Sequence, residues 1–188
     1  MMKRSIVLLL ILYIACHVRI DAQSKWIDRS ADALCLTPAV TGLVAAIVKK
    51  DKKGILELSL SAATGIAVNY GLNACIRKDR PQMPAAPGWS DRHAFPSTHT
   101  MAAFDGATFL MRRYGWKWGV PAYAVSTYVA WARVHTKKHD WWDVVGGAAV
   151  GAGCALIYTR PFTKSIDLSI APASFGDEAQ GITATLNF

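Results

Sequence analysis

Cysteine is scarce in this chain: four cysteines occur in 188 residues, and no two of them show the Cys-x-x-Cys spacing. That spacing is typical of zinc sites and thiol oxidoreductases, so neither class is indicated. If the N-terminal segment is removed as a leader, Cys35, Cys75 and Cys154 remain, and an odd number excludes a fully paired disulfide framework. Three free buried thiols are the simplest expectation, with a Cys35–Cys75 disulfide between neighbouring helices as the alternative.

Acidic residues are also few, with 13 Asp and Glu against 21 Lys and Arg, which gives a net charge of +8. Such an excess can indicate nucleic-acid binding, but here the basic residues form short clusters between apolar stretches, without a basic face of interleaved aromatics. Hydrophobic residues make up 52% of the chain, and the mean hydropathy is +0.20. Positive loops beside a bilayer explain this composition better, so we expect a membrane partner and no nucleic acid.

The N-terminus has the organisation of an export signal. Lys3 and Arg4 precede an apolar run at 6–16, and Ala22 supplies a small residue before a cleavage point. Because the run is short for a membrane span, residues 1–22 are predicted to be a cleaved signal peptide, with an uncleaved signal anchor as the alternative.

The strongest chemical signal is the segment 132–143, which reads A-R-V-H-T-K-K-H-D-W-W-D. His139 and Asp143 are four residues apart, so they face the same side if a helix begins near Asp140. A carboxylate at that distance can accept the Nδ1 proton of the imidazole and leave Nε2 free to attack. Arg133 supplies a permanent planar charge that suits a pair of phosphate oxygens.

Two upstream segments have matching chemistry. Arg80 ends a short basic run that includes Lys78, and Pro96-Ser97-Thr98-His99 opens an apolar helix. Ser97 stands at the predicted N-cap of that helix. The backbone N–H groups that follow it are a ready anion site, and His99 lies in the same first turn.

Together these segments resemble the motifs K-x6-R-P, P-S-G-H and S-R-x5-H-x3-D of the type 2 phosphatidic acid phosphatase/haloperoxidase superfamily. The resemblance covers residues 73–143. It implies an all-α bundle of five to six membrane-embedded helices and a phosphatase that needs neither metal nor cofactor. It further implies that His139 is the nucleophile and forms a phosphohistidine, that Asp143 orients it, and that His99 acts as acid and base. The phosphate-binding residues implied are Arg80, Arg133, Ser97 and Thr98, and we add Lys78 as a candidate from its position beside Arg80.

The chain departs from these motifs at three positions. Thr98 replaces a glycine and Ala132 replaces a serine, and neither change removes a charge. Asn73 stands where the first motif has lysine, so one phosphate-binding charge is missing. Three nearby residues are candidates to supply it instead: Lys78, Arg77 and His93. A non-catalytic phosphate- or lipid-binding protein is the alternative that Asn73 leaves open.

Five apolar segments lack strand alternation and are predicted to be helices. They are 34–48, 54–76, 99–111, 116–133 and 141–158. Basic residues follow the first and the third of them, and the positive-inside rule places both loops in the cytoplasm. The catalytic candidates then face the periplasm from a bacterial inner membrane. Several short segments and a mid-helix Asp105 keep a soluble periplasmic bundle as the alternative.

Two further patterns predict local structure. Gly147 and Gly151 are four residues apart, which lets a neighbouring helix approach closely. We expect residues 23–160 to form the helical domain. In the tail at 161–188 the alternation of apolar and polar residues predicts a short C-terminal β-hairpin, with a disordered tail as the alternative.

The substrate expected from these observations is a phosphate monoester or a diphosphate. A site that opens at a bilayer surface favours a membrane lipid: polyprenyl diphosphate, phosphatidylglycerol phosphate, phosphatidate or lipid A. A soluble periplasmic acid phosphatase of broad specificity is the second enzyme hypothesis. Vanadium haloperoxidases share the motifs but typically have a much larger chain.

Overall fold

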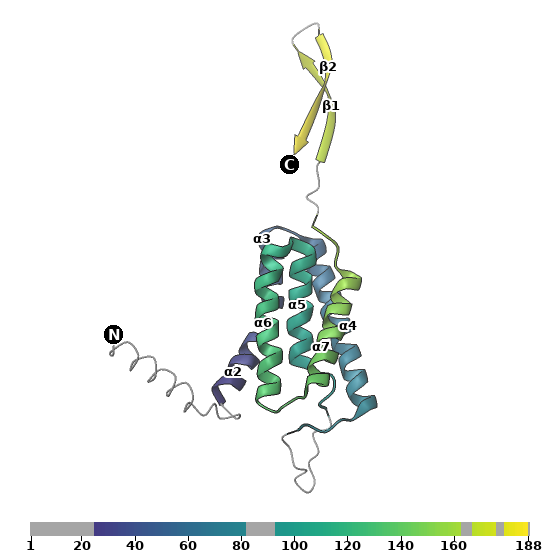
Figure 1. The fold of residues 1–188 in the computed structure, drawn as a ribbon. Coiled ribbons are helices and arrows are strands. Elements are labelled where there is room, and N and C mark those ends of the chain that lie inside the picture. Colours follow the sequence, from purple (N-terminus) through teal and green to yellow (C-terminus); the bar gives the residue numbers. More distant parts are fainter. Residues whose placement is uncertain (1–24, 82–92, 163–166, 176–178, 188) are drawn as a thin grey trace, which may run out of the picture.

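The computed structural model describes residues 25–81, 93–162, 167–175 and 179–187, so the predicted leader lies outside the described residues. Within these ranges the chain forms six α-helices and two β-strands (Figure 1). The helices are α2 (Lys25–Leu34), α3 (Thr37–Val48), α4 (Lys52–Ile76), α5 (Thr98–Tyr114), α6 (Trp116–His135) and α7 (Trp141–Tyr158). The strands β1 (Asp167–Phe175) and β2 (Ala179–Asn187) pair antiparallel, with Pro172 opposite Ile182.

The prediction of an all-α helical bundle is confirmed, and each of the five apolar segments coincides closely with one of the helices α3 to α7. The sequence reading missed α2, because its ten residues alternate between charged and apolar too often to form an apolar segment. Only two residues separate α2 from α3, and together they form one apolar stretch, Trp26–Val48. All three cysteines of the described part are free thiols, as expected, but only Cys35 and Cys154 are buried, whereas Cys75 is exposed.

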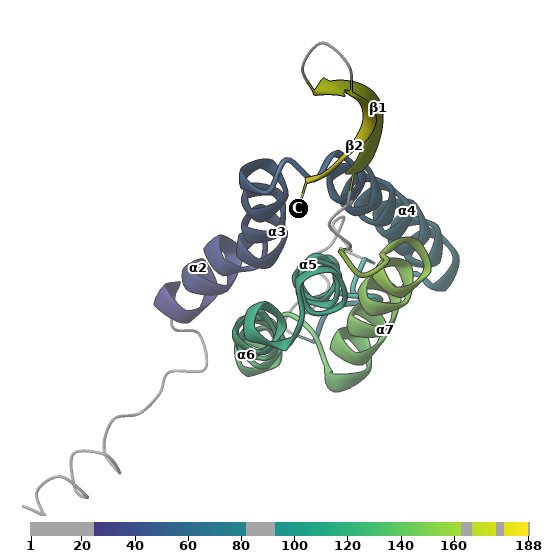
Figure 2. The same cartoon turned by 90° about the horizontal axis from the view of Figure 1, so that it is seen from above.

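Helix α5 lies at the centre of the bundle, with α3, α4, α6 and α7 arranged around it (Figure 2). Its side chains fill the core: Ala103, Ala107 and Phe109 are completely buried. Phe109 packs with Leu58 of α4 in the main hydrophobic cluster. Because α5 is surrounded on all sides, the residues at its N-terminus are held rigidly at one end of the bundle.

Helix α7 approaches α5 closely through two glycines, as the sequence predicted. A Cβ atom on Gly147 would overlap the carbonyl oxygen of Ser97, and one on Gly151 would overlap that of Met101. No other residue type fits at either position without separating the helices. This contact brings the N-terminal turns of α5 and α7 side by side.

The opposite end of the bundle is held by a buried charge network. Arg113, near the end of α5, donates from Nε to Asp51 Oδ2 at 2.7 Å and from one terminal nitrogen to Glu57 Oε2 at 3.1 Å. The hydroxyl of Tyr114 also donates to Asp51 Oδ2, at 2.9 Å. These contacts join the loop after α3 to the loop after α5, so both basic loops lie at one end, as predicted. They also neutralise Arg113, which therefore adds little to the positive charge of that end.

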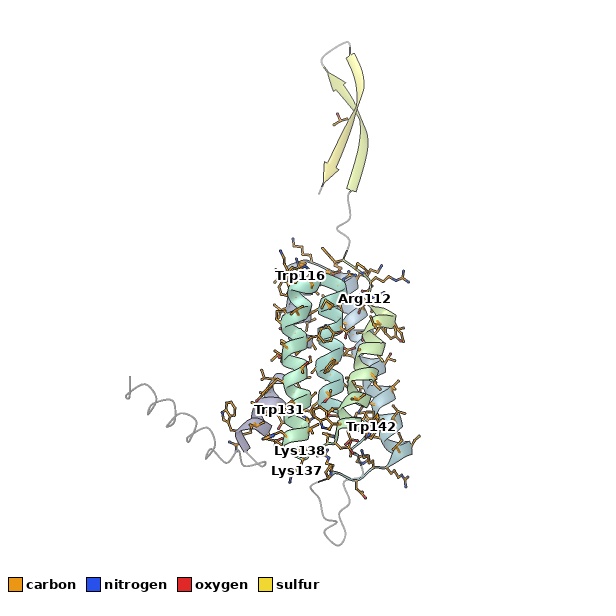
Figure 3. All side chains as sticks on the ribbon, in the orientation of Figure 1. Arg112, Trp116, Trp131, Lys137, Lys138 and Trp142 are labelled. Atoms are coloured by element: carbon orange, nitrogen blue, oxygen red, sulfur yellow. The ribbon has the colours of Figure 1, made fainter. Side chains whose placement is uncertain are left out.

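Several features indicate a membrane protein. Three helical stretches are long and apolar enough to cross a bilayer: Trp26–Val48, Lys52–Ile76 and Trp141–Tyr158. Exposed tryptophans stand at both ends of the bundle, with Trp116 at one end and Trp131 and Trp142 towards the other (Figure 3). Along α6, Trp116 and Trp131 are about 22 Å apart, from the 1.5 Å rise per residue, which suits two interfacial belts.

Asp105 does not argue against this location. The residue is 2% exposed and accepts a hydrogen bond from the hydroxyl of Ser61 in α4. A carboxyl group that faces the bundle interior and has a donor is tolerated at membrane depth. Asp105 is therefore compatible with a membrane location.

Candidate active site

The three motif segments meet at the end of the bundle opposite Arg113. The backbone N–H of Ser97 donates to the carbonyl oxygen of Asp143 at 2.9 Å, which ties the start of α5 to the start of α7. The N–H of Ala94 donates to the carbonyl oxygen of Lys78 at 3.0 Å, which ties the loop before α5 to the end of α4. These backbone hydrogen bonds thus join residues up to 46 positions apart in the sequence, from 97 to 143.

His139, in the loop between α6 and α7, is 5% exposed. Its Nδ1 lies 2.8 Å from the carbonyl oxygen of Ala94. A carbonyl can only accept, so Nδ1 carries the proton and Nε2 keeps its lone pair. Burial, together with the positive charge of Arg80, lowers the pKa of His139 to about 4. The imidazole is therefore neutral near pH 7, the form that a nucleophile requires.

The acceptor of this proton differs from the one expected, which was Asp143. The distance between His139 Nδ1 and Asp143 Oδ2 is 3.6 Å, too long for a hydrogen bond. Both carboxylate oxygens of Asp143 are occupied by other donors. Oδ2 accepts the backbone N–H of Asp140 at 2.9 Å, and Oδ1 accepts from Lys78 Nζ at 2.7 Å. Asp143 therefore acts on His139 through its charge and not by accepting the ring proton.

The start of α7 agrees with the sequence. Asp140 is the N-cap, and its side chain accepts the N–H of Asp143 at 3.1 Å to complete a capping box. Lys78 also donates to Asp140, so one ammonium group bridges two carboxylates. Although burial opposes it, the hydrogen bonds to Asp140 and Asp143 raise the pKa of Lys78. The role of Lys78 as a phosphate ligand stays a prediction, since its charge is matched in this structure.

Arg133 and His99 lie together on the other side of His139. Arg133, in the last turn of α6, is 2% exposed, and His99 is in the first turn of α5. Both are contacted by α2: one terminal nitrogen of Arg133 is 3.1 Å from Asp28 Oδ1, and the other donates to Asp32. The Nε2 atom of His99 lies 3.1 Å from Asp32 Oδ1. Arg80 completes the cluster, because its charge acts on both His99 and His139.

Ser97 takes the predicted N-cap position of α5 but does not cap the helix with its side chain. Its hydroxyl instead accepts a hydrogen bond from Thr100 Oγ1 at 3.2 Å, and its backbone N–H donates to the carbonyl oxygen of Asp143. The hydroxyl of Thr98 accepts from Asn69 Nδ2 at 2.9 Å. The anion site expected here therefore rests on the N–H groups that follow Ser97, which have no acceptor within the helix.

Asn73 is buried one helical turn from Asn69, and its Nδ2 donates to the Asn69 carbonyl oxygen at 3.0 Å. Of the three residues considered as substitutes for the motif lysine, Lys78 is the one that reaches the cluster. Arg77 is exposed and donates to the carbonyl oxygen of Ala74, and His93 is exposed.

Sequence reasoning did not identify Asp28, Asp32 or the carbonyl of Ala94 as parts of the site. The two aspartates did carry a signal, since they are four residues apart and so share one face of a helix. A backbone carbonyl has no sequence signal at all. Within the described ranges, no group of three or more His, Cys, Asp and Glu side chains could hold a metal ion.

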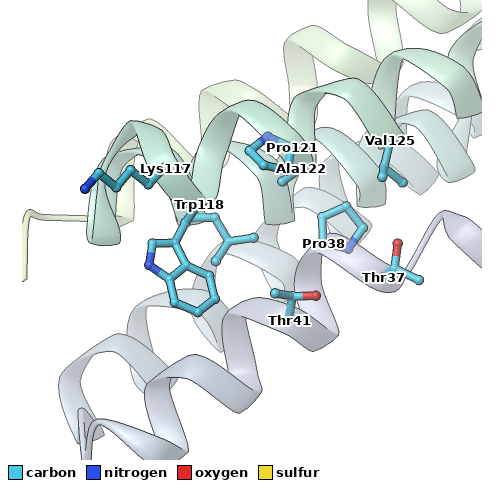
Figure 4. Close-up of a pocket in the computed structure, with 9 residues that line it drawn as sticks. Thr37, Pro38, Thr41, Lys117, Trp118, Pro121, Ala122 and Val125 are labelled. Atoms are coloured by element: carbon cyan, nitrogen blue, oxygen red, sulfur yellow. The ribbon is translucent and has the colours of Figure 1, made fainter.

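A cavity of about 190 Å³ lies between α3 and α6, lined by residues that include Thr41, Trp118 and Val125 (Figure 4). None of its lining residues belongs to the cluster around His139. The catalytic candidates therefore occupy a different part of the bundle from this cavity.

Comparison with known proteins agrees with the motifs. The sequence pattern of the PAP2 superfamily matches residues 54–167, which is more than half of the chain. A Lipid A 4'-phosphatase from Helicobacter pylori is 28% identical over 141 residues, covering 72% of this chain and 71% of the relative. The fold is similar to that of Aquifex aeolicus LpxE, with a TM-score of 0.61, 19% identity and coverage of 80% and 93% of the two chains. It is also similar to a phosphatidylglycerolphosphate phosphatase from Bacillus subtilis, with a TM-score of 0.50, 20% identity and coverage of 84% and 94%.

Proposed function

The chain belongs to the PAP2 superfamily, and on that premise we propose that it hydrolyses a membrane lipid phosphate through a phosphohistidine on His139. The observation that carries the proposal is the hydrogen bond from His139 Nδ1 to the Ala94 carbonyl oxygen. It leaves Nε2 as the nucleophilic atom, in a cluster that also contains Arg80, Arg133 and His99. This combination of a fixed nucleophile with permanent positive charge suits phosphoryl transfer.

In the proposed reaction, Nε2 of His139 attacks phosphorus and the bond from phosphorus to the lipid oxygen breaks. Arg80 and Arg133 bind the non-bridging oxygens and stabilise the charge that develops on them. His99 gives a proton to the departing oxygen, then takes one from the water that attacks the phosphohistidine. The products are the dephosphorylated lipid, inorganic phosphate and the free His139.

The substrate we propose first is a phosphate group of lipid A. A relative that covers most of this chain is a Lipid A 4'-phosphatase, and the bundle exposes apolar side chains such as Leu56, Ile66 and Val145 to its surroundings. Exposed tryptophans near the catalytic cluster suit a site at the membrane surface. The basic loops at the other end favour an active site on the periplasmic side.

The test is phosphate release by the detergent-purified full chain from lipid A, phosphatidate, phosphatidylglycerol phosphate, polyprenyl diphosphate and p-nitrophenyl phosphate, with and without EDTA. We expect the highest kcat/KM with lipid A, turnover that survives EDTA, and none for His139→Ala. His135→Ala is the matched control, because this histidine stacks on Trp131 with ring centroids 4.7 Å apart and lies outside the cluster. Turnover by His139→Ala near the wild-type rate would refute the proposed nucleophile.

The same panel separates the two other hypotheses. An acid phosphatase of broad specificity would prefer p-nitrophenyl phosphate to every lipid. A non-catalytic binding protein would release no phosphate from any compound yet would bind orthovanadate, an analogue of the five-coordinate phosphorus. Asn73 motivates the latter hypothesis, because it removes one charge that the motif contains.

A further inference from the structure

Helix α2 is fixed against the bundle beside the catalytic cluster. The hydroxyl of Ser30 lies 2.7 Å from that of Tyr128 in α6, and Ala31 is completely buried. Cys35, directly after the helix, packs against Ala103 and Val129. These contacts use one face of α2 and decide which of its side chains point towards the cluster.

Two side chains of α2, Asp28 and Asp32, point towards the cluster, and both are carboxylates. Asp28 pairs with Arg133 and with Lys138, whose Nζ lies 2.7 Å from Asp28 Oδ2. Asp32 uses a single oxygen, Oδ1, to contact both Arg133 and His99 Nε2. An anionic oxygen therefore already sits between the arginine and the histidine.

Those two groups are the ones that the proposed reaction assigns to the substrate. A phosphoryl group with a non-bridging oxygen bound by Arg133 and its leaving oxygen beside His99 would need the place that Asp32 Oδ1 occupies. A carboxylate and a phosphate dianion cannot share that place, because two unit charges 4 Å apart repel by several kcal/mol at the dielectric of a protein surface. Asp32 must therefore withdraw before the substrate binds.

We propose that Asp32 is an intramolecular substitute for phosphate, which makes α2 an autoinhibitory element of this site. The inference rests on the proposed function, since it takes Arg133 and His99 as the groups that bind phosphate. The two carboxylates have different roles in this proposal. The side chain of Asp28 is 25% exposed and is held by two cations, whereas that of Asp32 is 49% exposed and can rotate towards solvent. Asp28 keeps α2 docked, and Asp32 exchanges with phosphate.

A positioning role for Asp32 makes the opposite prediction. If Asp32 served to hold His99 protonated for the reaction, its removal would lower kcat. If it competes with phosphate, its removal lowers the Michaelis constant and strengthens the binding of phosphate. The difference between these outcomes is large enough to measure in one variant.

The experiment is titration calorimetry of inorganic phosphate into the detergent-purified full chain. Asp32→Asn keeps the shape of the side chain and removes its charge, and we expect about tenfold tighter phosphate binding and a similar fall in the Michaelis constant, equivalent to about 1.4 kcal/mol. Asp32→Glu keeps the charge and should bind phosphate as weakly as wild type. Lys137→Gln is the charge control, because it changes the net charge of the same end by one unit at an exposed side chain outside the cluster (Figure 3).

Phosphate binding that is unchanged or weaker in Asp32→Asn overturns the proposal, as does a lower kcat at constant KM. Phosphate binding that weakens about tenfold in Lys137→Gln also overturns it, because net charge alone would then explain the effect of Asp32→Asn. Calorimetry needs no turnover. Tighter phosphate binding by a protein that hydrolyses none of the lipids would therefore support the role of Asp32 while refuting the proposed function.

Discussion

His139 donates its Nδ1 proton to the backbone carbonyl oxygen of Ala94 across 2.8 Å, and this contact decides which nitrogen of the ring can react. The acceptor belongs to the loop that leads through Ser97 into α5, and the first turn of α5 carries His99. Nucleophile and proton donor are therefore positioned by the same short segment. A backbone acceptor has the further property that side-chain substitution cannot remove it.

The first prediction concerns the covalent intermediate. Phosphate should be attached to Nε2 of His139, because Nδ1 is protonated and bonded to Ala94. Rapid quenching under alkaline conditions, followed by ³¹P NMR of the phosphoprotein, distinguishes the two ring positions. His139→Gln should give no phosphoprotein. Phosphate on Nδ1, or on His99, would contradict the assignment.

A second prediction follows from the position of Asp143. Because this carboxylate does not accept the Nδ1 proton, Asp143→Asn should lower kcat by only about tenfold, or about 1.4 kcal/mol. Loss of a carboxylate that fixes the tautomer directly costs about 10⁴-fold in a serine protease triad. Steady-state kinetics at saturating substrate provides the comparison. A loss near 10⁴-fold would mean that Asp143 accepts the ring proton during the reaction.

A third prediction tests the missing charge at position 73. Lys78 is bound to Asp140 and Asp143, so we expect that no residue fully replaces the motif lysine. Asn73→Lys should therefore lower the Michaelis constant several-fold, since a charged hydrogen bond exceeds a neutral one by about 1 kcal/mol. Asn73→Met, which has similar length and no charge, is the control. If Lys78→Met proves to be the variant with a raised Michaelis constant and Asn73→Lys has no effect, Lys78 is the phosphate ligand.

The fourth prediction concerns the contact between α5 and α7. Gly147→Ala should lower both stability and kcat, because the added methyl group overlaps the Ser97 carbonyl oxygen and pushes the nucleophile loop away from His99. Gly153→Ala on the same helix meets no atom within 4 Å and should be neutral or stabilising by up to about 1 kcal/mol. Thermal unfolding in detergent and kcat are measured for both variants. Equal effects of the two substitutions would show that this helix contact does not position the site.

The fifth prediction concerns pH. Burial and Arg80 lower the pKa of His139, so its neutral form persists well below the value of about 6.5 for an unperturbed histidine. Nucleophilic competence should therefore be retained as the pH falls through 6.5 and lost only when it approaches the lowered pKa. NMR titration of the ring protons reports this directly, with His139→Gln to assign the signal. A midpoint at or above 6.5 would show that the ring is not desolvated as the structure indicates.

The sequence alone predicted the five helices α3 to α7 and the residues of the motifs, but not α2. Apolar segments such as 54–76 and 141–158 specify helices through local composition, and the start of α7 at Asp140 follows from its own side chain. The close approach of α7 at Gly147 was also predictable, since only glycine permits it. These features depend on residues that are near one another in the chain.

Only the tertiary structure decided which groups face His139 and Arg133. Asp143 was the expected partner of His139 because the two residues are four positions apart. In the structure, Lys78, 65 residues from Asp143, donates to one of the Asp143 carboxylate oxygens. The carbonyl oxygen of Ala94 accepts the Nδ1 proton of His139 instead. Asp32 reaches Arg133 across 101 residues of sequence. Such pairings depend on how rigid helices pack and on how each buried donor finds an acceptor, and spacing along the chain carries no information about either.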